Sequence, residues 1–473
     1  MAARTSQSSK VPRPTASRQV YRSSGSSSVE RRVRSDSQRR VGGTPRGGRR
    51  PESTGGRSRG IVAHVLEFFY KNPGKVDGGF VATLMVLIVF GLLVLFSASY
   101  AIALYRFDNI YEYFLPQLIF AIVGTGIMFV ASMFDYTKLK PFAWGMHTGS
   151  LVMLVAVLFM DPISGVHRWI NMKGIPSIQA SDIAKFTLIL VLALHFSKKR
   201  RIIEERQSPY ENFVETIVKP GIILGPILVL LYLEPHNSAM ILMTCITASI
   251  MFMGGAMIRW FVTAGAAAVA GFAVMLITRG GYVQERLQGW LDPFADMQDS
   301  TRQTGQSLYT IASGGLFGVG IGNSVQKHMW LPESQNDFIF AILCEELGFV
   351  GGVLCILLFA LLVVQGLVIA KKAPDRFGNL LVVGCMAQIG FQALLNVAVV
   401  TNTIPNTGIS LPFFSAGGTS LLMLMGQMGL VLSVCRAGNR KIATDKAQRE
   451  QNPPEQPPKT VEFSKGHNGS RFR

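Results

Sequence analysis

Residues 321–348 read IGNSVQKHMWLPESQNDFIFAILCEELG, and they join a polar segment to a long apolar run. The run begins at Phe338 and continues to about residue 370, which is long enough to cross the hydrocarbon core of a bilayer. Asp337 is the last polar residue before this run, so we expect its carboxylate at a membrane–water boundary, near the N-terminus of a helix. Unpaired backbone N–H groups and the helix dipole favour the ionised form of an acid at such a place.

The residues alone leave two roles open for Asp337. The side chain could cap the helix, with Asn336 sharing that role. Alternatively, an ionised acid at this depth could accept a proton from a substrate that is carried by a lipid. The two roles are compatible with each other.

The whole chain has the composition of a polytopic helical membrane protein. Of its 473 residues, 49% are apolar and only 16% are charged, and several apolar runs approach or exceed 18 residues. We predict an all-α fold of about ten transmembrane helices, with a long extracellular loop before the eighth. The predicted spans are 79–103, 113–133, 141–160, 181–197, 218–233, 237–255, 260–277, 338–369, 379–401 and 417–434.

The formal charge of +18 is concentrated in two tails. Residues 1–60 carry 15 Lys/Arg against 3 Asp/Glu, and residues 436–473 carry 9 against 4, so the remainder is nearly neutral. Basic residues that flank membrane spans mark the cytoplasmic side and attract anionic lipid. We therefore expect a membrane protein with both termini in the cytoplasm and no nucleic-acid partner.

The chain divides into three parts on this interpretation. Residues 1–77 form a disordered basic cytoplasmic tail, since a Ser/Arg/Gly-rich segment buries too little apolar surface to fold. Residues 78–436 form the membrane domain, with an extracellular loop at 278–337, and residues 437–473 form a C-terminal cytoplasmic tail. Two further outer segments, 161–182 and 402–418, are also rich in Gly, Pro and polar groups. The five cysteines are expected to be reduced.

Charged residues beside the first outer segment are candidates for anion binding. Asp182 and Lys185 lie three residues apart on one face of the fourth predicted span. A lysine inside an apolar span should face a partner or a wet cavity, so Lys185 either pairs with Asp182 or binds a substrate anion. Arg168 could clamp a phosphate, whereas Trp169 beside it is typical of an interfacial anchor.

Further candidates lie around Asp337. At about 1.5 Å of rise and 100° per residue, Glu345 is predicted about 12 Å along the helix and nearer the cavity side, while Glu346 points to the far side as a helix–helix partner. A buried pairing role is the alternative for both. Glu333 either tunes the acid, helps to bind a cation, or is a simple loop acid. Lys327 either meets an anionic headgroup or is solvated.

The run SGGLFGVGIGNS at 313–324 contains G-x-G-x-G. A nucleotide-binding loop of this kind would need a preceding strand in a βαβ unit. Neither is predicted here, so we reject a nucleotide site.

Several short sequence blocks occur in the same order as in a known family, and through them the chain resembles that family. It is similar to the SEDS proteins (shape, elongation, division and sporulation), the FtsW/RodA/SpoVE group, over residues 78–436. The blocks that carry the resemblance are GVHRWI (165–170), QASDIAK (179–185), QSL (306–308), SGGL (313–316), LPESQNDF (331–338), EELG (345–348), PNTGI (405–409), LPF (411–413) and SAGGTS (415–420). The chain departs from the family's pattern at Ala180, Asp182, Gln335-Asn336 and Ala416.

The resemblance implies a peptidoglycan glycosyltransferase that polymerises lipid II at the outer face of the bacterial cytoplasmic membrane, for division or for shape. The family's catalytic acid corresponds to Asp337, and Ser415 falls in a matching block as a substrate-binding candidate. We expect inverting transfer, with Asp337 as general base and Arg168, Lys185 and Lys327 stabilising the anionic leaving group. No cofactor is certain, but a divalent cation such as Mg²⁺ or Mn²⁺ could take part.

The implied partners are lipid II and undecaprenyl-linked glycan, a class B penicillin-binding protein that acts as transpeptidase, and other membrane proteins of the divisome or elongasome. The long basic N-terminal tail favours a division-type member such as FtsW. Two alternatives remain from the residues: a lipid II flippase with Lys185 and Glu345 along its route, and a division scaffold without enzymatic activity.

Overall fold

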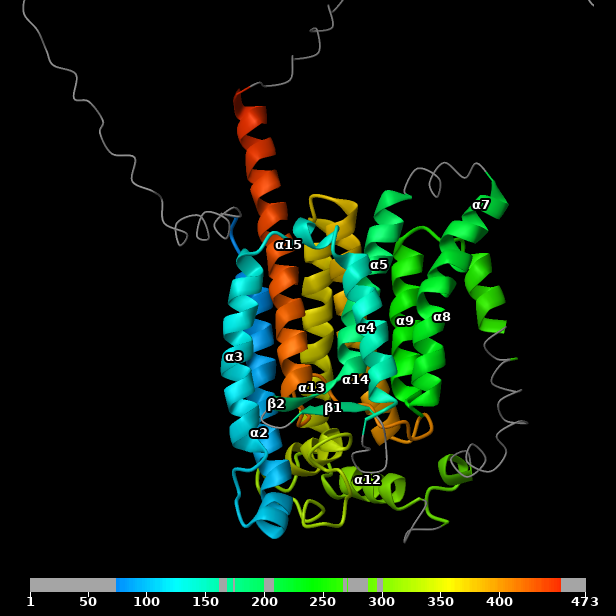
Figure 1. The fold of residues 1–473 in the computed structure, drawn as a ribbon. Helices are drawn as coiled ribbons and strands as arrows, with labels where there is room; N and C mark the ends of the chain where they lie inside the picture. Colours follow the sequence, from blue (N-terminus) through cyan, green and yellow to red (C-terminus); the bar gives the residue numbers. More distant parts are fainter. Residues whose placement is uncertain are drawn as a thin grey trace, which may run out of the picture. The chain divides into compact units, whose positions relative to one another are not determined.

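The computed structural model describes residues 74–160, 168–172, 175–199, 208–266, 270, 288–295 and 301–451. Within these residues it is a bundle of helices with one small hairpin (Figure 1). The longer elements are α2 (Gly78–Phe107), α3 (Phe114–Met133), α4 (Ala143–Val157), β1 (Trp169–Met172), β2 (Ile175–Gln179), α5 (Ala180–Lys198), α8 (Lys219–Leu233), α9 (Asn237–Met253), α12 (Arg302–Ser313), α13 (Ile339–Lys371), α14 (Arg376–Val400) and α15 (Gly418–Gln451). Short turns η1 (Tyr136–Leu139), α7 (Pro209–Phe213) and η2 (Val214–Val218) connect some of them.

The multi-pass membrane character predicted from composition is confirmed. Seven helices of the described part are long and apolar enough to cross a membrane, and two shorter apolar helices, α4 and α9, accompany them. Each of these helices coincides with a predicted span. The predicted span 260–277 lies largely outside the described residues, so the count of ten stays a prediction.

The bundle has a protein-facing centre and a lipid-facing rim. In the most apolar 18-residue window of each helix, 83% of the α5 residues are buried inside the protein, whereas only 22% of the α3 residues are. Glycines permit close approach between helices, as is usual in membranes. A Cβ atom at Gly384 of α14 would clash with Ile189 of α5, and one at Gly429 of α15 would meet the backbone of Met128 in α3.

The described parts of the three predicted outer segments gather at one end of the bundle. Strands β1 and β2, helix α12 and the segment before α15 all lie at the lower end of Figure 1. The two strands are antiparallel, with Trp169 opposite Gln179. Hydrogen bonds join the segments, from Thr419 Oγ1 to the Ser177 carbonyl (3.0 Å) and from Asn406 Nδ2 to Gln303 Oε1 (2.9 Å). Residues 161–167, 278–287 and 296–300 lie outside the described part.

Helix α13 differs from the continuous span that its sequence predicts. Gly348 has φ 71° and ψ −170°, which breaks the helix into two pieces. The glycine-rich run lies against this break, because the N–H groups of Val319 and Gly320 donate to the carbonyls of Glu345 and Glu346 (3.0 Å each). The run therefore has a structural use: its backbone satisfies the carbonyl groups that the broken helix leaves unpaired.

The last helix also extends beyond its predicted end. Helix α15 continues to Gln451, although the apolar run stops at about residue 434. Its exposed, charged final turns are not separated from the span by a break, so the tail predicted from residue 437 begins as helix. Residues 452–473 and the N-terminal residues 1–73 lie outside the described part.

We predict that Gly348→Ala lowers the thermal unfolding temperature of the purified protein. The new Cβ atom would clash with the backbone of Leu316 and Gly318, and a non-glycine residue at positive φ adds about 1–3 kcal/mol of strain. Gly126→Ala is the matched control, since nothing lies within 4 Å of a Cβ atom there. Equal melting temperatures for the two variants would contradict the role assigned to the break.

Candidate functional site

A polar cavity opens where the outer segments meet the bundle. Its volume is about 200 Å³, and its walls come from β1, β2, α5, α9, α14, α15 and the segments before α13 and α15. Its polar lining residues are Arg168, Gln179, Lys185, His236, Ser238, Asn336, Asp337, Gln392, Ser410 and Ser420. The structure therefore brings Arg168, Trp169, Lys185 and Asp337, which the sequence singled out separately, to one site.

Asp337 presents an unpaired carboxylate to this cavity. The residue is half-buried, and no described residue donates a hydrogen bond to its side chain. Its backbone carbonyl accepts from Asn396 Nδ2 (2.8 Å), which also donates to Ile409 (2.6 Å). Of the two roles left open for Asp337, the capping role is not present, because Phe338 occupies the N-cap position of α13 and no side chain caps this helix. The carboxylate is thus held in place by its backbone and left available for chemistry.

The protonation of Asp337 also differs from the expectation. The pKa of Asp337 is raised to about 6: removal from water is the largest cause, the nearby negative charge of Glu333 adds to the rise, and the positive charge of Arg168 opposes it. The sequence predicted a helix N-terminus that favours ionisation, but partial burial without a hydrogen-bond donor outweighs the dipole. A base with a pKa near neutral pH is still mostly ionised at pH 7 and binds a proton more strongly than an ordinary aspartate.

Two cations face the cavity with the acid. Lys185 Nζ lies 2.6 Å from Asp182 Oδ1, and both side chains are more than nine-tenths buried. Lys185 therefore both pairs with Asp182 and lines the cavity, although the sequence had left these as alternatives. Arg168 donates from Nη2 to the carbonyl of Pro235 (2.6 Å), so the loop between α8 and α9 fixes the position of its guanidinium.

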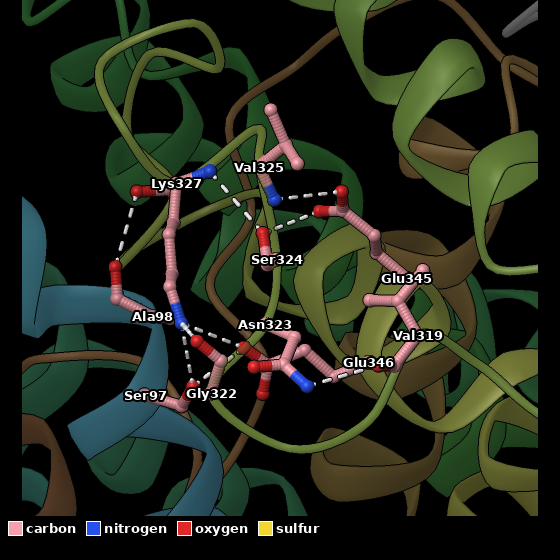
Figure 2. Close-up of polar contacts among 11 residues, drawn as sticks. Ser97, Ala98, Val319, Gly322, Asn323, Ser324, Val325, Lys327, Glu345 and Glu346 are labelled. Atoms are coloured by element: carbon pink, nitrogen blue, oxygen red, sulfur yellow. Dashed lines mark hydrogen bonds and ion pairs between the residues drawn. The ribbon is translucent and has the colours of Figure 1, made fainter.

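Lys327 and Glu346 form a buried pair outside the cavity. Figure 2 shows Lys327 Nζ among Ser97, Gly322 and Glu346, at 3.2, 2.6 and 3.0 Å from their oxygen atoms. The Lys327 side chain has no exposed surface, and it also lies 5.0 Å from the ring centroid of Tyr100. Glu346 therefore pairs between helices as predicted, whereas Lys327 does not reach the cavity as a headgroup ligand.

Glu345 does not reach the cavity either. Its carboxylate accepts hydrogen bonds from Ser324 Oγ and from the N–H of Val325 (3.0 Å), and the residue is 2% exposed. The prediction that it faces the cavity is wrong. The break at Gly348 and the loop packed against it explain this, because that loop occupies the side on which a cavity was expected.

Two other candidates support the position of the acid from nearby. Ser415 Oγ donates to the Asn336 carbonyl (2.6 Å) and accepts from the N–H of Leu411 (2.8 Å), which ties the segment before α13 to the segment before α15. Glu333 is exposed, has φ 52°, and accepts from Asn336 Nδ2 (2.6 Å). Neither residue lines the cavity, although Glu333 acts on Asp337 through its charge.

His236, Ser238 and Gln392 line the cavity, yet they were not predicted from the sequence. A signal was available: Glu234 and His236 are ionisable residues between two apolar helices. Burial raises the pKa of the Glu234 carboxyl to about 7, although the charge of Arg168 opposes the shift.

The described residues contain no group of three or more His, Cys, Asp or Glu side chains that could hold a metal ion. Asp337 is the carboxylate that lines the cavity. The residues described here therefore do not by themselves complete a protein cage for a divalent cation.

Comparison with known proteins gives consistent results. The FtsW/RodA/SpoVE family, described as cell cycle protein, matches residues 79–440. Stage V sporulation protein E of Bacillus subtilis is 37% identical over 74% of this chain and 94% of its own length. A probable peptidoglycan glycosyltransferase FtsW of Coxiella burnetii is 33% identical over 76% of this chain and 95% of its own length.

Solved structures agree with the fold. A chain from a peptidoglycan synthase complex that coordinates polymerisation and crosslinking aligns with a TM-score of 0.64 and 25% identity, over 77% of this chain and 98% of that one. The rod-shape-determining protein RodA of Thermus thermophilus aligns with a TM-score of 0.55 and 24% identity, over 76% and 97%.

We predict that Lys327→Met destabilises the protein by about 3–5 kcal/mol, since it leaves the buried Glu346 carboxylate without its cation. The double variant Lys327→Met/Glu346→Gln should recover much of this loss, because it removes the second charge as well. Denaturant or thermal unfolding in detergent measures both. A single variant with wild-type stability would contradict a structural role and would return Lys327 to the set of substrate ligands.

Proposed function

Given that the chain belongs to the FtsW/RodA/SpoVE family of cell cycle proteins, we propose that it is a peptidoglycan glycosyltransferase. Its substrate on this proposal is lipid II, which it polymerises into glycan strands for cell division or cell shape. The relatives that bear the name of this activity match nearly their whole length, which supports the transfer of the activity. The solved synthase complex supports it independently.

One observation carries the proposal: the unpaired carboxylate of Asp337 faces two cations across a polar cavity. The two buried lysines of the described residues are paired, Lys185 with Asp182 and Lys327 with Glu346. An uncompensated acid is costly to keep at such a place and is therefore a functional candidate.

The chemistry is an inverting displacement. Asp337 accepts the proton of the acceptor's sugar hydroxyl while the hydroxyl oxygen attacks the anomeric carbon of the donor. The bond from that carbon to the diphosphate oxygen breaks, and its electron pair leaves with the polyprenyl diphosphate. General-base assistance of this kind is typically worth about 10²–10⁴ in rate.

The negative charge of the leaving group needs stabilisation at the same moment. Arg168 and Lys185 are placed for this task, because both line the cavity and both are fixed by their contacts with Pro235 and Asp182. Fixed cations in a site that excludes water lower the barrier without reorganisation. Lys327 does not belong to this set, since it is buried with Glu346.

A divalent cation, Mg²⁺ or Mn²⁺, stays a part of the proposal. Mg²⁺ retains several waters and is often held by one or two carboxylates together with substrate phosphates. Because the described residues offer no cluster of three or more acidic, His or Cys side chains, we expect substrate oxygens to provide most of its ligands.

The proposal includes partners and an orientation. We propose that the chain works with a crosslinking transpeptidase, a class B penicillin-binding protein, and with other membrane proteins of the divisome or elongasome. The cavity end faces the outer side of the bacterial cytoplasmic membrane and both termini face the cytoplasm, in line with the distribution of Lys and Arg in the loops.

We predict that Asp337→Asn abolishes glycan synthesis from labelled lipid II by purified protein, with a loss of about 10²-fold or more. The matched control is Glu112→Gln, which removes an acid from the α2–α3 connection outside the cavity. The control should retain wild-type activity, and neither variant should melt below the wild type, since Asp337→Asn removes a partly desolvated charge. Unchanged polymer from Asp337→Asn would remove this residue as the base. A transpeptidase partner is added to all samples if the wild type needs it.

The activity should also depend on pH in a defined direction. Asp337 works as a base only when ionised, so the rate should rise with pH through a midpoint near 6. Glu333→Gln removes a negative charge that raises the pKa of Asp337, so it should move this acidic limb to lower pH. The measurement is the turnover rate between pH 4.5 and 8 for both proteins, where a limb that moves upward or not at all would contradict the assignment.

A further inference from the structure

The N-terminus of α9 ends in the same cavity and has no internal partner for its backbone donors. His236 occupies its N-cap position, and no side chain caps the helix. The first N–H groups of a helix have no partner within the helix, and the dipole makes that end attractive to anions. Ser238 and Ala239, in the first turn, line the cavity.

Two side chains at this end are buried and lack partners. His236 is 6% exposed and Ser238 is 4% exposed. Among the described residues, neither Ser238 Oγ nor His236 Nδ1 has a hydrogen-bond partner. His236 lines the cavity, and its Nδ1 atom is enclosed. Buried polar groups in native proteins are normally satisfied, so the unpartnered hydroxyl of Ser238, a residue that lines the cavity, points to a ligand there.

The charges around His236 define what that ligand would be. The cationic groups that face it are Arg168, whose guanidinium donates to the adjacent Pro235 carbonyl, and Lys185 of α5. The acids on the surrounding elements are Asp182 beside Lys185, Asp337, and Glu234 at the end of α8. Helix α14 contributes the neutral Gln392.

We propose that the N-terminus of α9, together with His236, Ser238, Arg168 and Lys185, forms the subsite for the diphosphate of a polyprenyl-linked donor, and that His236 takes up a proton when this anion binds. The inference rests on the proposed function for the identity of the donor. It adds a helix N-terminus, a hydroxyl and an imidazole to the two cations. A diphosphate supplies acceptor oxygens for all of these donors at once.

The proton uptake follows from the surroundings of the ring. Burial lowers the pKa of His236 well below its usual range, and the positive charges of Arg168 and Lys185 lower it further, so the free protein holds a neutral imidazole. A bound diphosphate offsets both cations and accepts a hydrogen bond from Nε2–H. The charged form of His236 is then favoured, which places a third cation against the leaving group as its charge develops.

Calorimetric binding of farnesyl diphosphate to the full-length protein tests the proposal. Titrations at pH 6.5 in two phosphate-free buffers with different ionisation enthalpies report both affinity and the number of protons taken up. We expect His236→Gln to bind roughly tenfold more weakly and to take up about one proton fewer than the wild type. The difference in affinity between the wild type and His236→Gln should be smaller at pH 8.5 than at pH 6.5. Protons that the ligand itself takes up are the same for every variant, so the difference between variants reports on the protein.

Matched controls make the result specific. His328→Gln, at an exposed position outside the cavity, should leave affinity and proton uptake unchanged. Ser238→Ala should weaken binding a few-fold without altering proton uptake, since a hydroxyl contributes a neutral hydrogen bond. Melting temperatures of all variants establish that a loss of binding is not a loss of folding.

Several outcomes would overturn the proposal. If His236→Gln binds with wild-type affinity and proton uptake, His236 is not part of the subsite. If the wild type does not bind farnesyl diphosphate, the subsite does not exist. Equal affinity for inorganic pyrophosphate would assign the subsite to a free anion and not to a lipid-linked donor. If the wild type binds with the expected uptake but makes no glycan with its partner present, the proposed function fails while the subsite stands.

Discussion

The constraint on which this structure depends is the cost of keeping a carboxylate partly out of water without a hydrogen-bond donor. Asp337 carries this cost, because its pKa is raised to about 6 while no described residue donates a hydrogen bond to its side chain. Such a group persists only where the surrounding structure fixes it. Asn396 fixes it by bridging the carbonyls of Asp337 and Ile409, and Ser415 fixes the neighbouring Asn336. The atoms that lack a hydrogen-bond donor are thus the side-chain oxygens of Asp337, which face the cavity.

Other contacts at the outer end of the bundle also help to hold the segment around Asp337 in position. The break at Gly348 ends the first piece of α13 soon after Asp337, and the backbone of the glycine-rich run satisfies the carbonyl groups at the break. The Lys327–Glu346 pair, fully buried, anchors that run to α2 through Ser97. A buried pair is weak evidence for stability, but it specifies one arrangement of the loop over others. We infer that this pair holds the loop in one position against α2 and α13.

The sequence predicted the elements whose signals are local and long. Apolar runs located the spans that the structure contains as helices, and separate motif blocks correctly identified Asp337, Arg168 and Lys185, which the fold then brought together. Predictions failed where a tertiary contact decided the outcome. Glu345 was placed on the cavity side by ideal helical geometry, but positive φ at Gly348 and a packed loop changed its surroundings. His236 was missed because only the fold shows that a short connection between two helices borders the acid.

The central claim is that Asp337 is a partly desolvated base in the free protein. The most direct test is a ¹³C NMR titration of aspartate-labelled protein, in which the signal of Asp337 is identified by its absence from Asp337→Asn. This experiment reads protonation at the carboxyl group itself, without substrate or turnover. The account predicts a titration midpoint near pH 6. A carboxylate that stays ionised down to pH 4, as an ordinary exposed aspartate does, would contradict it.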